Sequence, residues 1–288
     1  MSTPVRDLTP VLLREWALPS VGDSKYSRGN VLVVGGAART PGAAQLAGLA
    51  ALRVGAGRLT LAVADRVAVP MAVAIPEAGV IGLPQTQQGS VLGADLSVIE
   101  DALGSADVVV IGPGLDEPEH TAELVRRALP LLSDDARLVL DAYALGVLPD
   151  LKDEVAALSG RLVLTPNGSE AGRLLGRDLD VLEDDVPEIA RTYGAVVSCQ
   201  GLVADPDGGC WRIGAGQIGL ATSGSGDVLA GAVAGIVARG TEPAQAPCWA
   251  SHIHAPAGDQ LAVSVGRLGF LAGELLAELP RVLVELGG

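Results

Sequence analysis

Short runs of apolar residues recur along the chain, and they do not alternate with polar residues. The runs cover residues 31–34, 58–63, 108–111, 137–140, 162–164 and 195–198. Strands of this kind are buried on both faces, as in a parallel sheet that is covered by helices. Helical patterns separate the runs, for example at residues 42–54 and 117–131. The alternation predicts a doubly wound α/β/α sandwich with a mostly parallel central sheet.

The length and composition are consistent with a single domain. The chain has 288 residues, of which 49% are hydrophobic, enough for a well-buried core. No long linker, block of charge or internal repeat interrupts it, so we expect one domain over residues 1–288. Residues 202–213 predict a β-hairpin. The helix at residues 42–55 is apolar nearly all round, which suits a fully buried position or a subunit contact, and we expect a homo-oligomer.

The formal net charge of −14 and the 2% aromatic content exclude several classes of partner. The sequence predicts no broad basic surface that could bind nucleic acid or anionic membranes. It also has few of the aromatic residues on which the bases of single-stranded nucleic acid stack. Three scattered cysteines, Cys199, Cys210 and Cys248, fit a reduced protein better than a disulfide scaffold. With no signal-peptide pattern and no apolar run long enough to span a bilayer, we expect a cytoplasmic protein.

Four of the expected strands end in small or polar residues. These ends are Gly112-Pro113-Gly114, Asp141, Thr165-Pro166-Asn167 and Gln200-Gly201. In open α/β sheets, ligands bind outside the carboxyl ends of the strands. We therefore expect the four ends to line one small-molecule crevice.

The segment Gly224-Ser225-Gly226-Asp227 leads directly into an apolar helical run at residues 228–236. A Gly-rich turn before a helix leaves the first backbone N–H groups unpaired, and the helix dipole adds positive potential there. Such a place holds anions, and phosphate in particular. Asp227 makes chemical sense there if it accepts a proton from a hydroxyl that attacks the bound phosphate. The alternative is that Asp227 merely caps the helix, because Asp is favoured at that position.

An ordered set of segments resembles one family over nearly the whole chain. The set comprises residues 25–29, 41–44, 52–57, 111–115, 140–145, 164–166 with Glu170, and 220–231. The G-x-G-D helix start resembles the ribokinase-like superfamily. The set as a whole is similar to its carbohydrate-kinase-domain family of ADP- or ATP-dependent NAD(P)H-hydrate dehydratases. The resemblance implies a ribokinase-like fold, and we expect no epimerase domain before it.

The resemblance also implies a chemistry. The substrate would be hydrated NADH or NADPH, in which water has added across a ring double bond of the nicotinamide. Phosphorylation of the resulting hydroxyl by ADP or ATP would turn a poor leaving group into phosphate, and elimination would restore the reduced cofactor. Mg²⁺ would bridge the phosphates of the nucleotide.

Site residues follow from the resemblance by position. Asp227 would be the catalytic base, with the amides of Gly224 and Gly226 holding the transferred phosphate. Residues that would contact the hydrated cofactor are Ala43, Ala44, Gly112, Gly114, Asn167 and Asp227. Residues that would contact the adenine nucleotide are Gln200, Gly201, Leu202, Val203, Ala204 and Gly226. Glu170 would hold Mg²⁺ through water, or else interact with the dipole of the helix that it starts.

The chain departs from the family pattern at three places. Asn167 stands where the family usually has His, and Gly168-Ser169 replace Pro-Gly. Gln200 stands where the family has Lys, which removes a positive charge near the nucleotide. The usual Asn after the hairpin is replaced near Gln217. These departures affect what can be predicted about the choice between ADP and ATP and about the rate of the reaction.

Other polar residues leave alternatives open. Lys25 and Arg28 are either phosphate partners or simply solvated. His252 and His254 are spaced by two residues on one helix, which places them on different faces and makes a metal pair unexpected.

Two other functions are consistent with these features. A small-molecule kinase of the same fold, for a thiazole alcohol or hydroxymethylpyrimidine, would share Asp227 and the anion site but release a stable phosphate ester. A catalytically silent nucleotide-binding protein is suggested by Asn167 and Gln200, and the intact Gly226-Asp227 pair argues against it.

Overall fold

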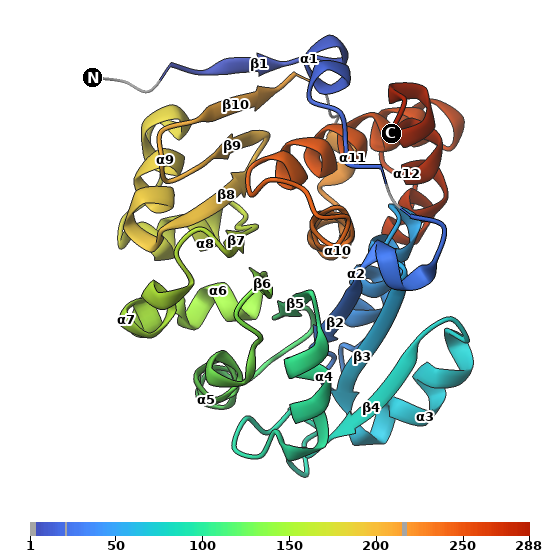
Figure 1. The fold of residues 1–288 in the computed structure, drawn as a ribbon, viewed down its shortest axis with the longest axis vertical. Helices are drawn as coiled ribbons and strands as arrows, with labels where there is room; N and C mark the ends of the chain where they lie inside the picture. The colour runs from blue at the N-terminus through green and yellow to red at the C-terminus, as the bar shows by residue number, and fades with distance from the viewer. Residues whose placement is uncertain (1–3, 21, 215–217) are drawn as a thin grey trace.

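All the strands that the structure describes belong to one sheet. The computed structural model describes residues 4–20, 22–214 and 218–288. The sheet has ten strands in the order β1-β10-β9-β8-β7-β6-β5-β2-β3-β4, and all of them except β9 run parallel (Figure 1). Their bounds are β1 (Arg6–Leu8), β2 (Asn30–Val34), β3 (Arg58–Ala64), β4 (Gly79–Leu83), β5 (Val108–Ile111), β6 (Arg137–Leu140), β7 (Leu162–Leu164), β8 (Ala195–Cys199), β9 (Leu202–Ala204) and β10 (Cys210–Ile213).

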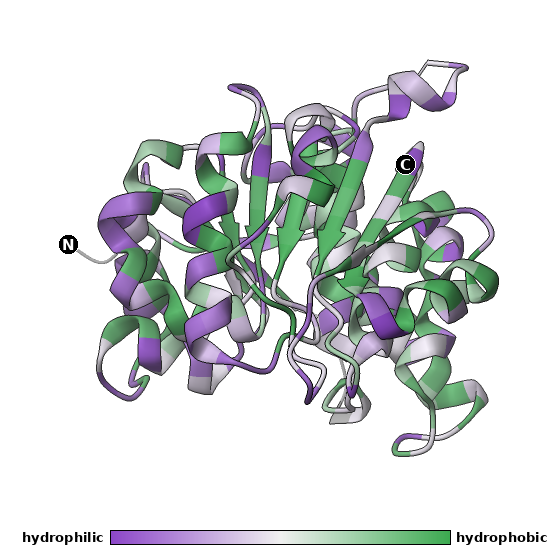
Figure 2. Ribbon diagram, turned by 90° about the horizontal axis from the view of Figure 1, so that it is seen from below, coloured by the Kyte–Doolittle hydropathy of each residue, from purple (hydrophilic) through white to green (hydrophobic). Residues whose placement is uncertain are grey.

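Helices cover both faces of the sheet. One face packs against α1 (Pro10–Glu15), α2 (Pro41–Arg53), α3 (Asp65–Ala74), α10 (Ser225–Val237), α11 (Gln245–Ser264) and α12 (Ala272–Leu286). The other packs against α4 (Glu100–Ser105), α5 (Pro118–Ala128), α6 (Tyr143–Val147), α7 (Lys152–Val155), α8 (Gly168–Leu175) and α9 (Leu182–Tyr193). Figure 2 shows the apolar sheet between the two layers, with hydrophilic residues on the outer sides of the helices.

The strands are apolar throughout because each contributes to two cores. In β2, Val31 and Val33 enter the core on one face, while Leu32 and Val34 enter the core on the other. Successive side chains of a strand point to opposite faces, so a strand buried on both sides cannot alternate with polar residues. The predicted α/β/α sandwich with a mostly parallel sheet is confirmed, and so is the hairpin, as β9 and β10.

Close contact between α2 and α10 explains why both helices are rich in small residues. A Cβ at Gly231 would lie 1.9 Å from the carbonyl oxygen of Ala47, and one at Gly235 would lie 2.4 Å from that of Ala51. The two backbones can therefore approach only where α10 has glycine. The helix α2 packs against the sheet, α10 and α12, but Leu46, Leu49 and Leu52 are only half-buried. A subunit contact of this helix stays a prediction.

The turn that contains Lys25 and Arg28 lies at the amino ends of the strands. It forms a short 3-10 helix, η1 (Lys25–Arg28), directly before β2. A Cβ at Gly29 would touch Ala238, which follows the last turn of α10, whereas Asp227 lies in its first turn. The 13 residues of α10 separate these ends by about 20 Å. Lys25 and Arg28, for which a phosphate contact and simple solvation were both left open, therefore lie too far from Asp227 to share a phosphate with it.

The contact between α2 and α10 leads to a stability prediction. Gly231→Ala places a methyl group on a backbone carbonyl that cannot yield, so we expect the free energy of unfolding to fall by about 1–3 kcal/mol. Urea denaturation measures the change. Gly273→Ala in α12 is the matched control, because no atom lies within 4 Å of its added Cβ. Equal stability of the two variants would contradict the packing described.

Candidate active site

The carboxyl ends of β5, β6, β7 and β8 meet along one edge of the sheet. These strands are consecutive neighbours and all run parallel, so the residues that follow them lie side by side. The four strand ends that the sequence singled out therefore share one edge. The first turn of α10 lies at this edge too, since the charge of Asp227 acts on the carboxyl group of Asp141 after β6.

The first turn of α10 presents unpaired backbone donors. Gly224 caps the helix with a φ of 90°, a left-handed conformation that glycine adopts without strain. The backbone N–H groups of Gly226 and Asp227 donate to no residue in the described part of the chain. A Cβ at Gly226 would have no atom within 4 Å, so the space over this residue is open. The turn can accept an anion directly on its backbone.

His254 supports this turn from α11, a role that the sequence did not reveal. Its Nε2 lies 3.1 Å from both the hydroxyl and the carbonyl oxygen of Ser225. Burial lowers the pKa of His254 to about 4, so the ring is neutral at pH 7. A carbonyl oxygen can only accept, so Nε2 carries the proton and donates to Ser225. The helical spacing of His254 in α11 gives no signal of this long-range contact.

Asp227 is a weaker acid than an ordinary aspartate side chain. Burial, together with the negative charge of Glu170, raises its pKa to about 6. A group that only capped the helix would accept from the backbone, yet no hydrogen bond from a described residue to the Asp227 carboxylate is present. A half-buried carboxylate with a pKa near neutrality is suited to take up a proton.

Glu170 and Asn167 together start α8. The backbone N–H of Asn167 donates to Glu170 Oε2 at 2.9 Å, and that of Glu170 donates to Asn167 Oδ1 at 3.0 Å. This reciprocal pair is a capping box. Of the two expected roles of Glu170, the structure therefore shows the one at the helix start. Its Oε1 remains for a further interaction, and burial raises the pKa of this carboxyl group.

Asp141 is a third carboxyl group at the same edge. It is 4% exposed and accepts a hydrogen bond of 2.7 Å from the hydroxyl of Thr165. Burial raises its pKa well above the usual value, and the charges of Asp227 and Glu170 add to the effect. The sequence marked both residues as strand ends but did not indicate that they pair.

These carboxyl groups fit a divalent cation that is shared with a phosphate ligand. The described residues contain no cluster of three or more His, Cys, Asp or Glu side chains that could hold a metal ion by itself. Mg²⁺ is usually bound by one or two carboxylates together with phosphates and water. The negative charge of Glu170 contributes to the raised pKa of Asp227, and a cation beside the two carboxylates would relieve this repulsion.

The residues expected to contact the hydrated cofactor lie at the same edge of the sheet. Gly112 has a φ of 130°, and a Cβ there would lie 1.8 Å from the carbonyl oxygen of Asp141. Gly114 has a φ of 73°, with the methyl group of Ala43 beside it. Ala43 is half-buried, but Ala44 is fully buried in the core. Neither the side chain nor the backbone of Ala44 is exposed at this edge, so its contact with a substrate stays a prediction.

The residues expected to contact the nucleotide divide into two groups. Gln200 and Gly201 form the turn after β8, and both have a positive φ, of 48° and 81°. The side-chain amide of Gln200 lies over Gly168 at the start of α8. Residues 202–204 form β9, whose side chains are buried and whose direction leads away from the edge. Gln217 lies outside the described residues.

A cavity of about 340 Å³ opens beside Glu170. Its lining includes Ala142, which has a φ of 50°, together with Tyr143 and Arg173. Arg173 lies three residues after Glu170 on α8, and its charge lowers the pKa of that carboxyl group. The i, i+3 spacing was a usable sequence signal for Arg173. It supplies the cationic lining of a cavity next to a cluster of acidic groups.

The charge of Glu170 can be tested through the pKa of Asp227. Glu170→Gln keeps the capping box, because Gln serves at that position, but it removes the charge. The pKa of Asp227 should then fall below the wild-type value of about 6. Carboxyl ¹³C NMR titration measures it, with Glu188→Gln on α9 as the control. An unchanged titration in Glu170→Gln would show that the two groups do not interact.

Comparisons with known proteins agree with this geometry. A family model of NAD(P)H-hydrate dehydratase matches residues 31–281. The ADP-dependent (S)-NAD(P)H-hydrate dehydratase of Xanthomonas campestris is 45% identical over 98% of this chain and 97% of that protein. The chain also matches bifunctional NAD(P)H-hydrate repair enzymes, and it spans about half of their length.

Solved structures share the fold. An ADP/ATP-dependent NAD(P)H-hydrate dehydratase of Bacillus subtilis, co-crystallised with ATP and Mg²⁺, has a TM-score of 0.79 and 26% identity, covering 98% of this chain and 99% of that one. Ribokinase of Thermotoga maritima has a TM-score of 0.55 at 15% identity, covering 89% and 99%. The ribokinase-like fold is thus confirmed, and the chain belongs to the NAD(P)H-hydrate dehydratase family.

Proposed function

We propose that this protein catalyses the ADP- or ATP-dependent dehydration of (S)-NAD(P)H hydrate to NAD(P)H. The family and the enzymes named in it support this reaction. The observation that carries the proposal is the joint placement of unpaired backbone donors and a carboxylate of raised pKa at the start of α10. A phosphate acceptor site and a proton acceptor thus stand in adjacent residues.

The first step is the transfer of a phosphoryl group to the ring hydroxyl of the hydrate. Asp227 takes the proton of the hydroxyl as the oxygen attacks the terminal phosphorus of the nucleotide. The bond from this phosphorus to the bridging oxygen breaks, and the nucleotide leaves with one phosphate fewer. The backbone N–H groups of Gly226 and Asp227 stabilise the charge that develops on the phosphoryl oxygens. Because these donors are held in place by the helix and by His254, little reorganisation is needed during the step.

The second step is elimination. The bond between the ring carbon and the phosphate oxygen breaks, and phosphate leaves with the electron pair. The neighbouring carbon gives a proton to water as the ring double bond forms. Glu170 and Asp227 are the residues that would hold Mg²⁺, which would supply charge neutralisation for the nucleotide phosphates.

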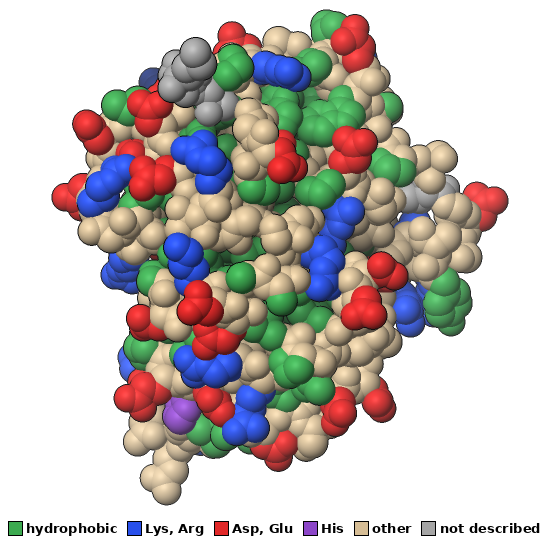
Figure 3. All heavy atoms as spheres, turned by 60° about the vertical axis from the view of Figure 1, so that its left-hand side comes forward, with side chains coloured by type: hydrophobic (Ala, Val, Ile, Leu, Met, Phe, Trp, Pro, Cys, Tyr) green, Lys and Arg blue, Asp and Glu red, His purple; other side chains and the backbone are tan. Residues whose placement is uncertain are grey.

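Several wider expectations accompany the reaction. We propose one domain over residues 1–288, a cytoplasmic location and a homo-oligomeric assembly, as the sequence suggested. No helix of the described chain is long and apolar enough to cross a membrane. Acidic and basic side chains are intermingled on the face in Figure 3, which does not resemble a nucleic-acid-binding surface.

The reaction is tested by incubating the protein with hydrated NADH, Mg²⁺ and either nucleotide. We expect absorbance near 340 nm to return together with release of phosphate. Asp227→Asn should slow turnover by about 10²–10⁴-fold, because a general base is lost while the fold is kept. In the wild type, kcat/KM should fall as pH drops below about 6, where Asp227 becomes protonated.

The control is Asp184→Asn, the same change in the exposed first turn of α9, which should leave turnover unchanged. Accumulation of a stable phosphate ester, with no return of absorbance, would point instead to a small-molecule kinase. Nucleotide binding without either product would point to a silent binding protein. Normal turnover by Asp227→Asn would leave this residue as a helix cap.

Gln200 gives a prediction on nucleotide affinity. Its side-chain amide forms neutral hydrogen bonds, which are roughly half as strong as those of a cation. Lys25 and Arg28 cannot replace the missing charge, because they lie at the opposite, amino end of the strands. Gln200→Lys should therefore tighten ADP and ATP binding, by a margin that shrinks as salt rises. Calorimetric titration measures the affinity, with Arg191→Lys on α9 as the control. Weaker binding by Gln200→Lys would show that another group already neutralises the phosphates.

A further inference from the structure

A second cavity, of about 330 Å³, lies at the amino ends of the strands. Its polar lining consists of Lys25 from η1, Asn30 from β2, Arg58 and Thr60 from β3, Glu77 before β4 and Ser105 at the end of α4. The cavity reaches along β2 as far as Leu32, whereas Gly112 and Asp141 follow the opposite, carboxyl ends of β5 and β6. Nothing in the proposed dehydratase reaction uses this cavity.

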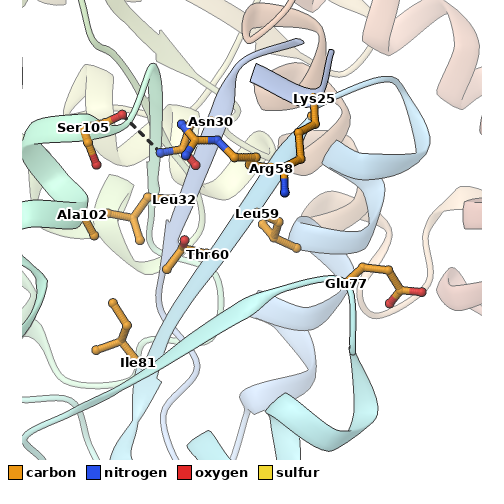
Figure 4. A pocket seen from close by; sticks show the side chains of 11 residues that line it. Lys25, Asn30, Leu32, Arg58, Leu59, Thr60, Glu77, Ile81, Ala102 and Ser105 are labelled. Atoms are coloured by element: carbon orange, nitrogen blue, oxygen red, sulfur yellow. Dashed lines mark hydrogen bonds between the residues drawn. The ribbon is translucent and has the colours of Figure 1, made fainter. Parts of the chain in front are cut away.

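The cations of the cavity lack carboxylate partners. Neither Lys25 nor Arg58 forms an ion pair with a described residue, and the Nε of Arg58 is buried without a hydrogen-bond partner. Glu77 is the one acidic side chain in the lining, and Figure 4 shows its carboxylate turned away from Arg58. In a chain of net charge −14, two cations that share a cavity without a counter-ion are conspicuous.

Tyr26 holds the two cations in place. The Nζ of Lys25 lies 5.4 Å, and the Cζ of Arg58 lies 5.1 Å, from the centre of the Tyr26 ring. Both cation–π contacts favour the observed side-chain positions. Both cations line one cavity, and in Figure 4 the guanidinium of Arg58 extends toward Asn30. The charges of Lys25 and Arg58 would both attract an anion bound in this cavity.

We propose that this cavity is a binding site for a small phosphate-bearing anion, either inorganic phosphate or a phosphate monoester. Lys25 supplies a point charge and Arg58 a planar guanidinium, the pair of donors that commonly recognises phosphate. Thr60 offers a neutral donor at the wall of the same cavity. The volume accommodates phosphate with a small organic group attached.

The experiment must separate this site from the anion site on α10. Gly226→Leu fills the open space over the first turn of α10, where an added Cβ meets no atom within 4 Å, and so blocks the active-site anion without a clash. In that variant, calorimetric titration with inorganic phosphate at low salt should still show one binding site. Ribose 5-phosphate and AMP, titrated in parallel, distinguish free phosphate from a monoester as the preferred ligand.

Charge removal then tests the residues. In the Gly226→Leu background, Lys25→Gln and Arg58→Gln should each weaken phosphate binding by at least about tenfold, and the binding should weaken as salt rises. Arg191→Gln, an exposed change on α9, should leave it unaltered. Because Lys25 is exposed, its variant remains informative if Arg58→Gln fails to fold. Absence of phosphate binding in Gly226→Leu, or equal binding after Lys25→Gln, would overturn the proposal.

Discussion

The close approach of α2 and α10 is the contact on which the active-site edge depends. Gly231 and Gly235 let the backbone of α10 rest on the carbonyl groups of α2. That contact aligns the two helices so that both begin at the carboxyl edge of the sheet. Gly224, which starts α10, packs against Leu46 of α2, while Ala43 at the start of α2 lies beside Gly114. Two helix N-termini are thereby directed at one place.

The second constraint is electrostatic. Asp141, Glu170 and Asp227 occupy one partly dry region, and burial raises the pKa of each. Keeping all three carboxyl groups ionised in this region costs free energy. A cation that binds together with a phosphate would offset that cost. In the proposed reaction the backbone donors of α10 bind that phosphate, and a carboxylate beside them accepts a proton. The acidic groups and the unpaired backbone donors of the site thus have complementary roles.

The most accurate predictions were those that rest on residues close together in the sequence. The strands at residues 108–111, 137–140 and 162–164 were expected with the bounds that the structure has, because a strand buried on both faces is recognised from its own residues. Contacts between distant segments were less accessible. The pairing of β1 with β10 and the contact of His254 with Ser225 join segments far apart in the sequence, so they depend on long-range packing. The capping of α8, in contrast, is a local contact, since Asn167 and Glu170 stand at capping-box spacing.

The sequence by itself determined the parallel sheet, the common edge for four strand ends and the anion-binding turn before Asp227, because each follows from local periodicity or glycine placement. The tertiary structure alone decided the acidity of Asp227, since burial and the charge of Glu170 raise its pKa. It also placed Lys25 at the opposite end of the sheet, because the direction of β2 separates residues before it from residues after it. Charge and distance between remote segments depend on packing, which local patterns do not encode.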